Sequence, residues 1–445
     1  MSVNLRRLGM CLAVLLLTAS LLQGMGWTDL TPRLRRSASM VTDTLNHRVI
    51  LFGGTNQSLS NEWFNDVWEM PLDGARACAW HQLSPSGTPP GGRGSAGVAY
   101  DPVHQRMLIF GGQNPTAQYG DIWSLSLTAG AESWQQLAPS GTTPPVRLGA
   151  FAAYDPARNA FVIFGGLGAE WYHDLWLLNL DSVVWHHLTP SGNVPGQRFN
   201  AASFYHAPTG RMCIFGGRGI GVTYNDLWAL DLTPGNERWA QLSPGGTVPS
   251  GRYEFAYGYD QIGERLFIFA GWDPDGGGLV DETYVLSRPG PVWTRLEPSG
   301  VIPLARRNST GAYDPYGGNF IVFGGDLGGD YYLGGTCCLD VGTGATIEWR
   351  LRPPLSAPAL TLSSLGSGST RIDYSAPLDK RIRIDVLDVA GRVVKGLLDE
   401  TAQSSTGSLL WDGRDESGRV TSSGSYFCRL RCGLTEVTRK FSKLD

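Results

Sequence analysis

Six short stretches of the chain share one order of apolar and small residues: aliphatic side chains, then Phe, then two small residues. They occupy residues 51–54, 109–112, 163–166, 214–217, 268–271 and 322–325. An apolar run that ends in glycines is typical of a buried strand followed by backbone that needs positive φ or a close approach. The first small residue recurs at positions 53, 111, 165, 216, 270 and 324. Strand-rich repeats of about fifty residues are typical of propellers and related arrays.

Further positions recur in register with these stretches. An Asp or His lies ten residues before each first small residue, and an Arg lies eight residues earlier still. In five copies a loop then leads to an acidic and an aromatic residue, and a motif Trp-x-x-Leu-x-Pro follows. These signals predict four short antiparallel strands in each unit. The repeated arginines are Arg35, Arg93, Arg147, Arg198, Arg252 and Arg306.

This pattern resembles the kelch repeat, whose units form the blades of a β-propeller. The resemblance extends over residues 27–353 and implies an all-β fold with a six-bladed kelch-type propeller. Because a propeller must close its ring, we expect residues 27–32, which carry an additional Trp-x-x-Leu-x-Pro motif, to lie beside the last blade. Residues 347–353 would then be a fifth strand of that blade or the exit from the propeller.

The first 26 residues have the order of a secretory signal peptide. Arg6 and Arg7 precede an apolar run over residues 8–22, and small residues follow before Trp27. We therefore expect a secreted or cell-surface protein whose mature chain has no transmembrane segment. The net charge of −4 gives no basic surplus, so nucleic acid is not an expected partner.

Residues 354–445 alternate between polar and apolar side chains and predict a small β-sandwich. The sequences Trp-Asp-Gly-Arg-Asp at 411–415 and Ser-Gly-Ser-Tyr-Phe at 423–427 resemble the Ig-like domain of the flagellar hook-assembly protein and the sorting domains of type IX secretion. This resemblance implies an exported bacterial protein whose C-terminal domain contacts secretion or surface machinery for export or attachment.

Six cysteines remain after residue 26, and no spacing among them requires a disulfide. The two at 428 and 432 are four residues apart on a predicted strand, which is too far for a bond. We expect most of them to be buried thiols. They are Cys78, Cys213, Cys337, Cys338, Cys428 and Cys432.

Residues that recur in every unit are expected to hold the blades. The repeated Arg should bridge loop carbonyls and acidic groups. The acidic residue before the third strand should accept backbone N–H groups, and the Trp of the fourth strand should cover the apolar face of its blade. In the fifth unit, Asp281 is assigned to the repeated acidic position.

Residues that vary between units are candidates for a site. The two positions after each Arg vary, and kelch propellers bind partners on the face formed by these positions and the loops between the second and third strands. A mixed polar and aromatic surface there would suit a protein or carbohydrate ligand, although an ordinary solvated rim is the alternative. The predicted ligand-binding residues are Ser95, Phe199, Asn200, Tyr253, Glu254, Arg307 and Asn308, with Trp171, Tyr172 and Trp272 from the loops.

Asp273 and Asp275 are candidate ligands of a Ca²⁺ ion, because Ca²⁺ takes several oxygen ligands. The full twelve-residue calcium loop is absent, and an acidic turn is the alternative. No other cofactor or metal is expected.

No catalytic motif for nucleophilic, zinc or phosphate chemistry occurs in the sequence. The sequence therefore favours a binding or interaction module with its ligand on the loop-rich face. One alternative is an extracellular carbohydrate-active enzyme with its site in the same place and Glu254 as the first candidate. The other is a purely structural surface protein.

Overall fold

A computed structural model describes residues 32–57, 62–72, 79–288, 290–300, 302–329, 331–341, 347–352, 359–366, 369–375, 381–389, 391–401, 406–432 and 435–443. The predicted signal peptide and Trp27 lie outside these residues. Within them the chain forms strands and one short 3-10 helix, η1 (Ala207–Thr209). No helix in the described part of the chain has the length and apolar character needed to cross a membrane.

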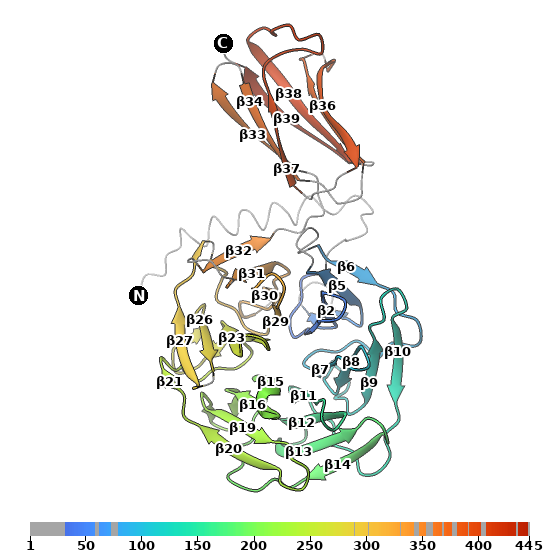
Figure 1. Cartoon of the computed structure of the whole chain (residues 1–445), viewed down its shortest axis with the longest axis vertical. Coiled ribbons are helices and arrows are strands. Elements are labelled where there is room, and N and C mark those ends of the chain that lie inside the picture. Colours follow the sequence, from blue (N-terminus) through green and yellow to red (C-terminus); the bar gives the residue numbers. More distant parts are fainter. Residues whose placement is uncertain are drawn as a thin grey trace. The chain divides into compact units, whose positions relative to one another are not determined.

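Six antiparallel sheets follow one another along the chain, and each forms one blade around a common axis (Figure 1). The strand that follows the repeated Arg is innermost, and the fourth strand is on the outside. Blades one to three consist of β1 (Ser39–Asp43), β2 (Arg48–Phe52), β5 (Val67–Pro71) and β6 (His81–Leu83); β7 (Gly97–Asp101), β8 (Arg106–Phe110), β9 (Ile122–Ser126) and β10 (Ser133–Leu137); and β11 (Phe151–Asp155), β12 (Ala160–Leu167), β13 (Trp171–Asn179) and β14 (Val184–Leu188).

The last three blades repeat the same order. They consist of β15 (Ala202–His206), β16 (Arg211–Phe215), β19 (Leu227–Asp231) and β20 (Arg238–Leu242); β22 (Ala256–Asp260), β23 (Arg265–Phe269), β26 (Thr283–Ser287) and β27 (Val292–Leu296); and β29 (Thr310–Asp314), β30 (Asn319–Phe323), β31 (Thr336–Asp340) and β32 (Glu348–Arg352). In blades five and six a two-residue strand from the preceding loop pairs in parallel with the outer strand. These short strands are β21 (Gly245–Gly246) and β28 (Ser299–Gly300).

The apolar core lies between adjacent blades. The Trp of each fourth strand packs against the Phe that precedes the small pair in the preceding blade, with ring centroids 4.6–5.5 Å apart in the five described pairs. The last of these seams joins blade six to blade one through Phe323 and Trp80. These tryptophans are at most 7% exposed, so the prediction that they cover the apolar faces is confirmed.

The ring closes with complete blades. In every blade the N–H of the second small residue donates to the carbonyl of the next blade's repeated Arg, and Gly325 donates to Arg35 across the closing seam. The outer strand of blade six is β32, so the expectation that residues 347–353 form a fifth strand or an exit was wrong. Of the motif at residues 27–32, only Pro32 lies within the described residues, so its predicted role as a clasp stays a prediction.

The small pairs allow the blades to approach closely. A Cβ on Gly53 would lie 2.6 Å from the carbonyl oxygen of Arg93, and φ at this glycine is +69°. A larger residue there would clash with the next blade, which explains the repeat of glycine. Blade five is the exception, because Ala270 occupies this position at φ +66°.

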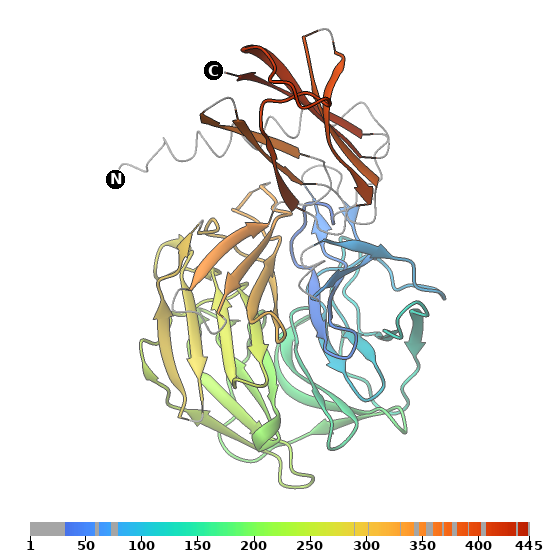
Figure 2. The same ribbon diagram turned by 45° about the horizontal axis from the view of Figure 1, so that its top comes forward.

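The C-terminal strands form two sheets that enclose a common core (Figure 2). Trp411 and Ile384 from opposite sheets are both fully buried in it. The first sheet contains β33 (Ala359–Gly366), β34 (Ser369–Ser375) and β37 (Thr406–Trp411), and the second contains β36 (Val393–Thr401), β35 (Arg381–Leu387), β38 (Gly424–Cys432) and β39 (Thr435–Lys443).

Five cysteines within the described residues are buried, as the sequence predicts. They are Cys213, Cys337, Cys338, Cys428 and Cys432. Cys78 lies outside the described residues.

Candidate functional site

The repeated arginines fasten each blade from within. In blades one to four each guanidinium is at most 1% exposed and makes two hydrogen bonds of 2.5–3.0 Å to the Asp before the third strand. Arg198, for example, binds Asp226 in this way and also donates to the carbonyl of Gly216. The expectation that these arginines bridge carbonyls and acidic groups is confirmed.

Two details of this arrangement differ from the sequence prediction. The acidic group accepts from the Arg and from the indole N–H of the Trp two residues later, as Asp226 does from Trp228, whereas backbone donors were expected. In blade five the position is filled by Glu282, which binds Arg252 at 2.7 Å. Asp281 was therefore assigned one residue too early.

Blade six lacks this ion pair. Gly335 stands where the other blades carry the acid, and Arg306 makes its hydrogen bonds to the carbonyls of Leu304 and Gly324. The Arg306 side chain is nevertheless buried, and burial lowers its pKa. The sixth blade therefore contains a buried cation without a carboxylate partner among the described residues.

A ring of six residues surrounds the axis on the loop-rich face, and we call it the collar. Each collar residue is the second after a repeated Arg, and all six have φ between +54° and +60°. The N–H of each donates to the carbonyl of the collar residue in the preceding blade at 2.7–3.1 Å, which makes a closed circle of six backbone hydrogen bonds. The collar consists of Ser37, Ser95, Gly149, Asn200, Glu254 and Asn308.

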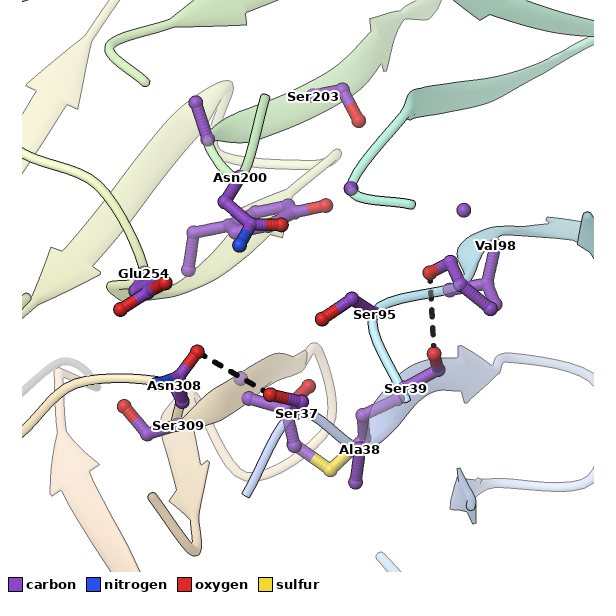
Figure 3. A pocket seen from close by; sticks show the side chains of 18 of the residues that line it. Ser37, Ala38, Ser39, Ser95, Val98, Asn200, Ser203, Glu254, Asn308 and Ser309 are labelled. Carbon is purple, nitrogen blue, oxygen red and sulfur yellow. Dashed lines mark hydrogen bonds between the residues drawn. The ribbon is translucent and has the colours of Figure 1, made fainter. Parts of the chain in front are cut away.

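The collar separates two hollows that share its side chains. Above it lies a depression of about 590 Å³, and below it lies an axial channel of about 130 Å³ lined mainly by small residues. Figure 3 shows Asn200, Glu254, Asn308, Ser37 and Ser95 directed toward this common space. The wall of the depression includes loop residues such as Trp63 and Gln113.

Three short hairpins stand in the loops between second and third strands. They are β3 (Thr55–Asn56) with β4 (Glu62–Trp63), β17 (Arg218–Gly219) with β18 (Val222–Thr223), and β24 (Trp272–Asp273) with β25 (Gly278–Leu279). In each hairpin the first residue after the small pair forms a bridge with the first residue after the repeated Arg.

The structure brings together six of the ten predicted site residues. Ser95, Asn200, Glu254 and Asn308 belong to the collar, and Phe199 and Arg307 line the depression. The other four do not line it directly.

Each of those four residues contacts an arginine or an aromatic side chain. Tyr253 is 4% exposed and accepts a hydrogen bond from Arg218. Trp272 lies beneath the Arg307 guanidinium, 5.1 Å from it, and Trp171 packs edge-on against Phe199. Tyr172 is 8% exposed, and its ring lies 4.0 Å from the Arg147 guanidinium.

A third set of residues lies beside the collar, and the sequence prediction included only one of them, Trp272. The residue directly after each small pair pairs with the first residue after the repeated Arg. Three residues of this set, Thr55, Gln113 and Leu167, line the depression. The available signal was their fixed position after the small pair combined with their variation between units.

The aspartates considered for Ca²⁺ are arranged as a turn. Asp273 is 3% exposed, and its Oδ1 accepts the backbone N–H groups of Asp275 and Gly276 at 3.0 and 2.8 Å. Within the described residues no group of three or more His, Cys, Asp or Glu side chains is placed to hold a metal ion.

Glu254 is an unusual member of the collar. It has φ +59°, a conformation that costs energy for a residue with a long side chain. Its side chain is 14% exposed, and its Oε2 is buried and accepts no hydrogen bond within the described residues. Burial raises the pKa of Glu254; nearby Arg307 and Arg36 oppose this effect, and Asp326 adds to it. Glu254 thus combines a costly backbone conformation with a buried, incompletely paired carboxyl group in the lining of the depression.

Replacing Glu254 by glutamine is expected to stabilise the protein more near pH 8 than near pH 4. A carboxyl group whose pKa is higher in the folded state destabilises that state as the pH rises above the unfolded value of about 4.3. Glutamine has no such titration, so the gain in the urea midpoint should grow with pH. The exposed Glu297, which is 79% accessible, provides Glu297→Gln as the control. An equal effect of Glu254→Gln at both pH values would contradict the account.

Comparisons with known proteins agree with this architecture. Residues 12–209 and 128–260 match the sequence model of the KLHDC2/KLHL20/DRC7 Kelch-repeats domain. The solved structure of YjhT superposes with a TM-score of 0.53 at 15% identity, covering 73% of this chain and 99% of YjhT. At that identity the likeness concerns the fold alone.

Curated relatives share the repeats within much longer proteins. The chain is 27% identical over 303 residues to the dynein alpha chain of the flagellar outer arm from Chlamydomonas reinhardtii, covering 63% of this chain and 6% of that protein. It is 28% identical over 274 residues to human host cell factor 2, covering 56% and 32% respectively. The chain thus spans less than a third of the length of either relative. Since the family matches together cover residues 12–260, more than half of its length, the chain belongs to the kelch-repeat family.

Proposed function

We propose that the propeller is an interaction module that binds a segment of a protein partner in the depression above the collar. Kelch repeats suggest such a module. The observation that carries the proposal is that the repeated residues and the variable residues lie in different parts of the propeller. The repeated Arg, Asp and Trp side chains are used inside the blades, whereas variable side chains such as Gln113, Phe199 and Arg307 meet in one depression.

The chemistry of the depression fits a peptide. Amide, hydroxyl, aromatic and charged groups converge there, and a hollow of about 590 Å³ is within the usual range for a binding site. Its collar is held by its own closed set of backbone hydrogen bonds. Such a rigid floor reduces the conformational entropy lost on binding.

A test begins with a phage-displayed library of disulfide-closed random heptapeptides, selected on the purified protein. Enriched peptides are then measured by fluorescence polarisation against two matched variants. Gln113→Trp places an indole in the depression and should raise Kd at least about tenfold, which is about 1.4 kcal/mol. Gln241→Trp, at an exposed site on β20, should change Kd by less than about twofold.

The same experiment separates the alternatives. If no peptide binds in a way that depends on Gln113, the protein-interaction proposal is wrong. A glycan array probed with the wild-type and Gln113→Trp proteins then tests the carbohydrate alternative, for which the aromatic residues Trp63 and Phe199 in the lining of the depression are the supporting feature.

We further propose that the protein acts outside the cytoplasm, with its C-terminal strands serving export or attachment. Support comes from the charged and apolar order of residues 1–26 and from the motifs at 411–415 and 423–427. The curated relatives described above are eukaryotic, so a bacterial origin rests on the C-terminal motifs alone. N-terminal sequencing of the protein recovered from its natural source should begin near Trp27; a chain that begins at Met1 would contradict export by cleavage.

A further inference from the structure

Blade six keeps the backbone hydrogen bond that positions the repeated acid in the other blades. In blade one the carbonyl of Asp66 accepts the N–H of Gly53, the first small residue. In blade six the carbonyl of Gly335 accepts the N–H of Gly324 in the same way. Gly335 therefore occupies the position of the acid, and the two blades differ there in the side chain alone.

The side chains that surround the repeated arginine are different in blade six. In blades one to four an acid binds the guanidinium, the centroid of an aromatic ring lies 3.7–4.1 Å from its central carbon, and a third-strand Trp donates to the acid. In blade six the same three positions hold Gly335, Leu333 and Cys337. A carboxylate and two large rings are thus replaced by three smaller, uncharged residues.

The Arg306 guanidinium has no negatively charged partner within the described residues. Its Nε and Nη1 donate to the carbonyls of Leu304 and Gly324, and its Nη2 has no oxygen acceptor in that part of the chain. Its ionisable neighbour there is the Cys337 thiol, and burial raises the pKa of this thiol although Arg306 opposes the shift. The thiol is therefore neutral near pH 7, whereas the arginine stays protonated. Because a buried charge without a partner is costly, an anion bound there would stabilise the fold.

The space beside Gly335 admits a small anion. A Cβ added to this glycine would meet no atom within 4 Å. Arg306 is 4% exposed, whereas the other five repeated arginines are at most 1% exposed. In blade four the same place holds the Asp226 carboxylate, whose oxygens lie 2.5 and 3.0 Å from the terminal nitrogens of Arg198. The other blades thus define the charge and the size of the group that fits.

We propose that blade six binds a small monovalent anion, chloride or a short carboxylate such as formate, between the guanidinium of Arg306 and Gly335. The anion takes the position of the repeated acid and neutralises the buried cation. Blade six adjoins blade one at the closing seam, where Gly325 donates to Arg35, so the anion stabilises the blade that completes the ring. This site is separate from the depression of the proposed function, because neither Arg306 nor Gly335 lines that depression.

The first test measures the urea midpoint of the purified protein while sodium chloride or sodium formate replaces sodium gluconate at constant ionic strength. Gluconate is the reference because it is much larger than a single carboxylate group. A ligand that binds only the folded state stabilises it with the logarithm of its concentration above Kd, so the wild-type midpoint should rise in this way with at least one of the two salts. The salt that acts at the lower concentration identifies the preferred anion. A midpoint that responds to neither salt would overturn the inference.

The second test supplies the carboxylate from the chain itself. In gluconate, Gly335→Asp should have a higher urea midpoint than the wild type, and chloride and formate should no longer raise it. Gln241→Glu adds the same charge at an exposed site on β20 and should keep the full wild-type response. If Gly335→Asp responds to the anions as strongly as the wild type does, they bind elsewhere and the inference is wrong.

A third variant removes the cation in case Gly335→Asp does not fold. Arg306→Met keeps a long side chain without the charge, and its urea midpoint should be independent of chloride and formate. A wild-type response that persists in Arg306→Met would equally overturn the inference. The proposed function is judged separately, because binding of the selected peptides depends on Gln113 and not on the salt response of blade six.

Discussion

Replacing Asp226 by alanine lowers the expected free energy of unfolding by about 3–5 kcal/mol, because removing one partner of a buried ion pair leaves the other charge uncompensated. The Arg198 side chain is fully buried, and both of its terminal nitrogens bind Asp226. The loss also frees the indole N–H of Trp228, which donates to the same carboxylate. Urea denaturation followed by tryptophan fluorescence measures the change.

Two variants serve as controls for this experiment. Glu62→Ala removes a pair with Arg33 in which both side chains are more than a third exposed, and it should cost less than about 1 kcal/mol. Gly335→Asp places a carboxylate where blade six lacks one, and a Cβ at this glycine meets no atom within 4 Å. That variant should raise the urea midpoint. If Asp226→Ala changes stability no more than Glu62→Ala does, the buried pairs do not hold the blades.

Replacing Trp239 by alanine should lower the free energy of unfolding by a similar amount, about 3–5 kcal/mol, because it leaves a large cavity between two blades. Trp239 is 1% exposed, and its ring centroid lies 4.9 Å from that of Phe164 in the preceding blade. Its indole N–H makes no hydrogen bond within the described residues. The loss is therefore one of packing.

Because the indole N–H of Trp239 makes no hydrogen bond within the described residues, replacement by phenylalanine serves as the control. Trp239→Phe keeps an aromatic ring at the seam and should cost much less than Trp239→Ala, as measured by the same urea titration. Equal losses for the two variants would show that the indole N–H, and not the packing between blades, stabilises this seam.

The blades could be predicted from the sequence because their signals are local. The apolar run before each small pair specifies a buried strand, and the small pair specifies where the chain must pass close to its neighbour. Gly53 fulfils this requirement against the carbonyl of Arg93. The buried Arg and Trp positions could also be predicted, because they recur in register with the small pairs.

The errors arose where a single residue of register decides the outcome. Asp281 and Glu282 are adjacent acids, and only the pairing of Tyr284 with Ile268 shows that Glu282 occupies the repeated position. The role of β32 depended on how the ring closes, which is a contact between the two ends of the repeat. Local patterns carry no information about that contact.

The site was predicted only in part, because the sequence shows which positions vary but not which of them meet around the axis. Variation after the repeated Arg identified collar residues such as Asn200 and Glu254, and the Gly and Asn residues among the collar positions favour positive φ. The closed circle of hydrogen bonds arises only from the curvature of six blades around one axis. The same curvature places blade three, with Leu148, opposite blade six, with Arg307. Gln113 and Asp326 were missed because their neighbours at the axis come from other segments of the chain.

The central claim is that variable residues around the collar bind a ligand while repeated residues hold the ring. The most direct measurement is the Kd of a selected peptide for Gln113→Trp, taken together with the urea midpoint of the same variant. We predict a rise in Kd of at least about tenfold with an unchanged midpoint. An unchanged Kd, or an equal rise for Gln241→Trp, would contradict the claim.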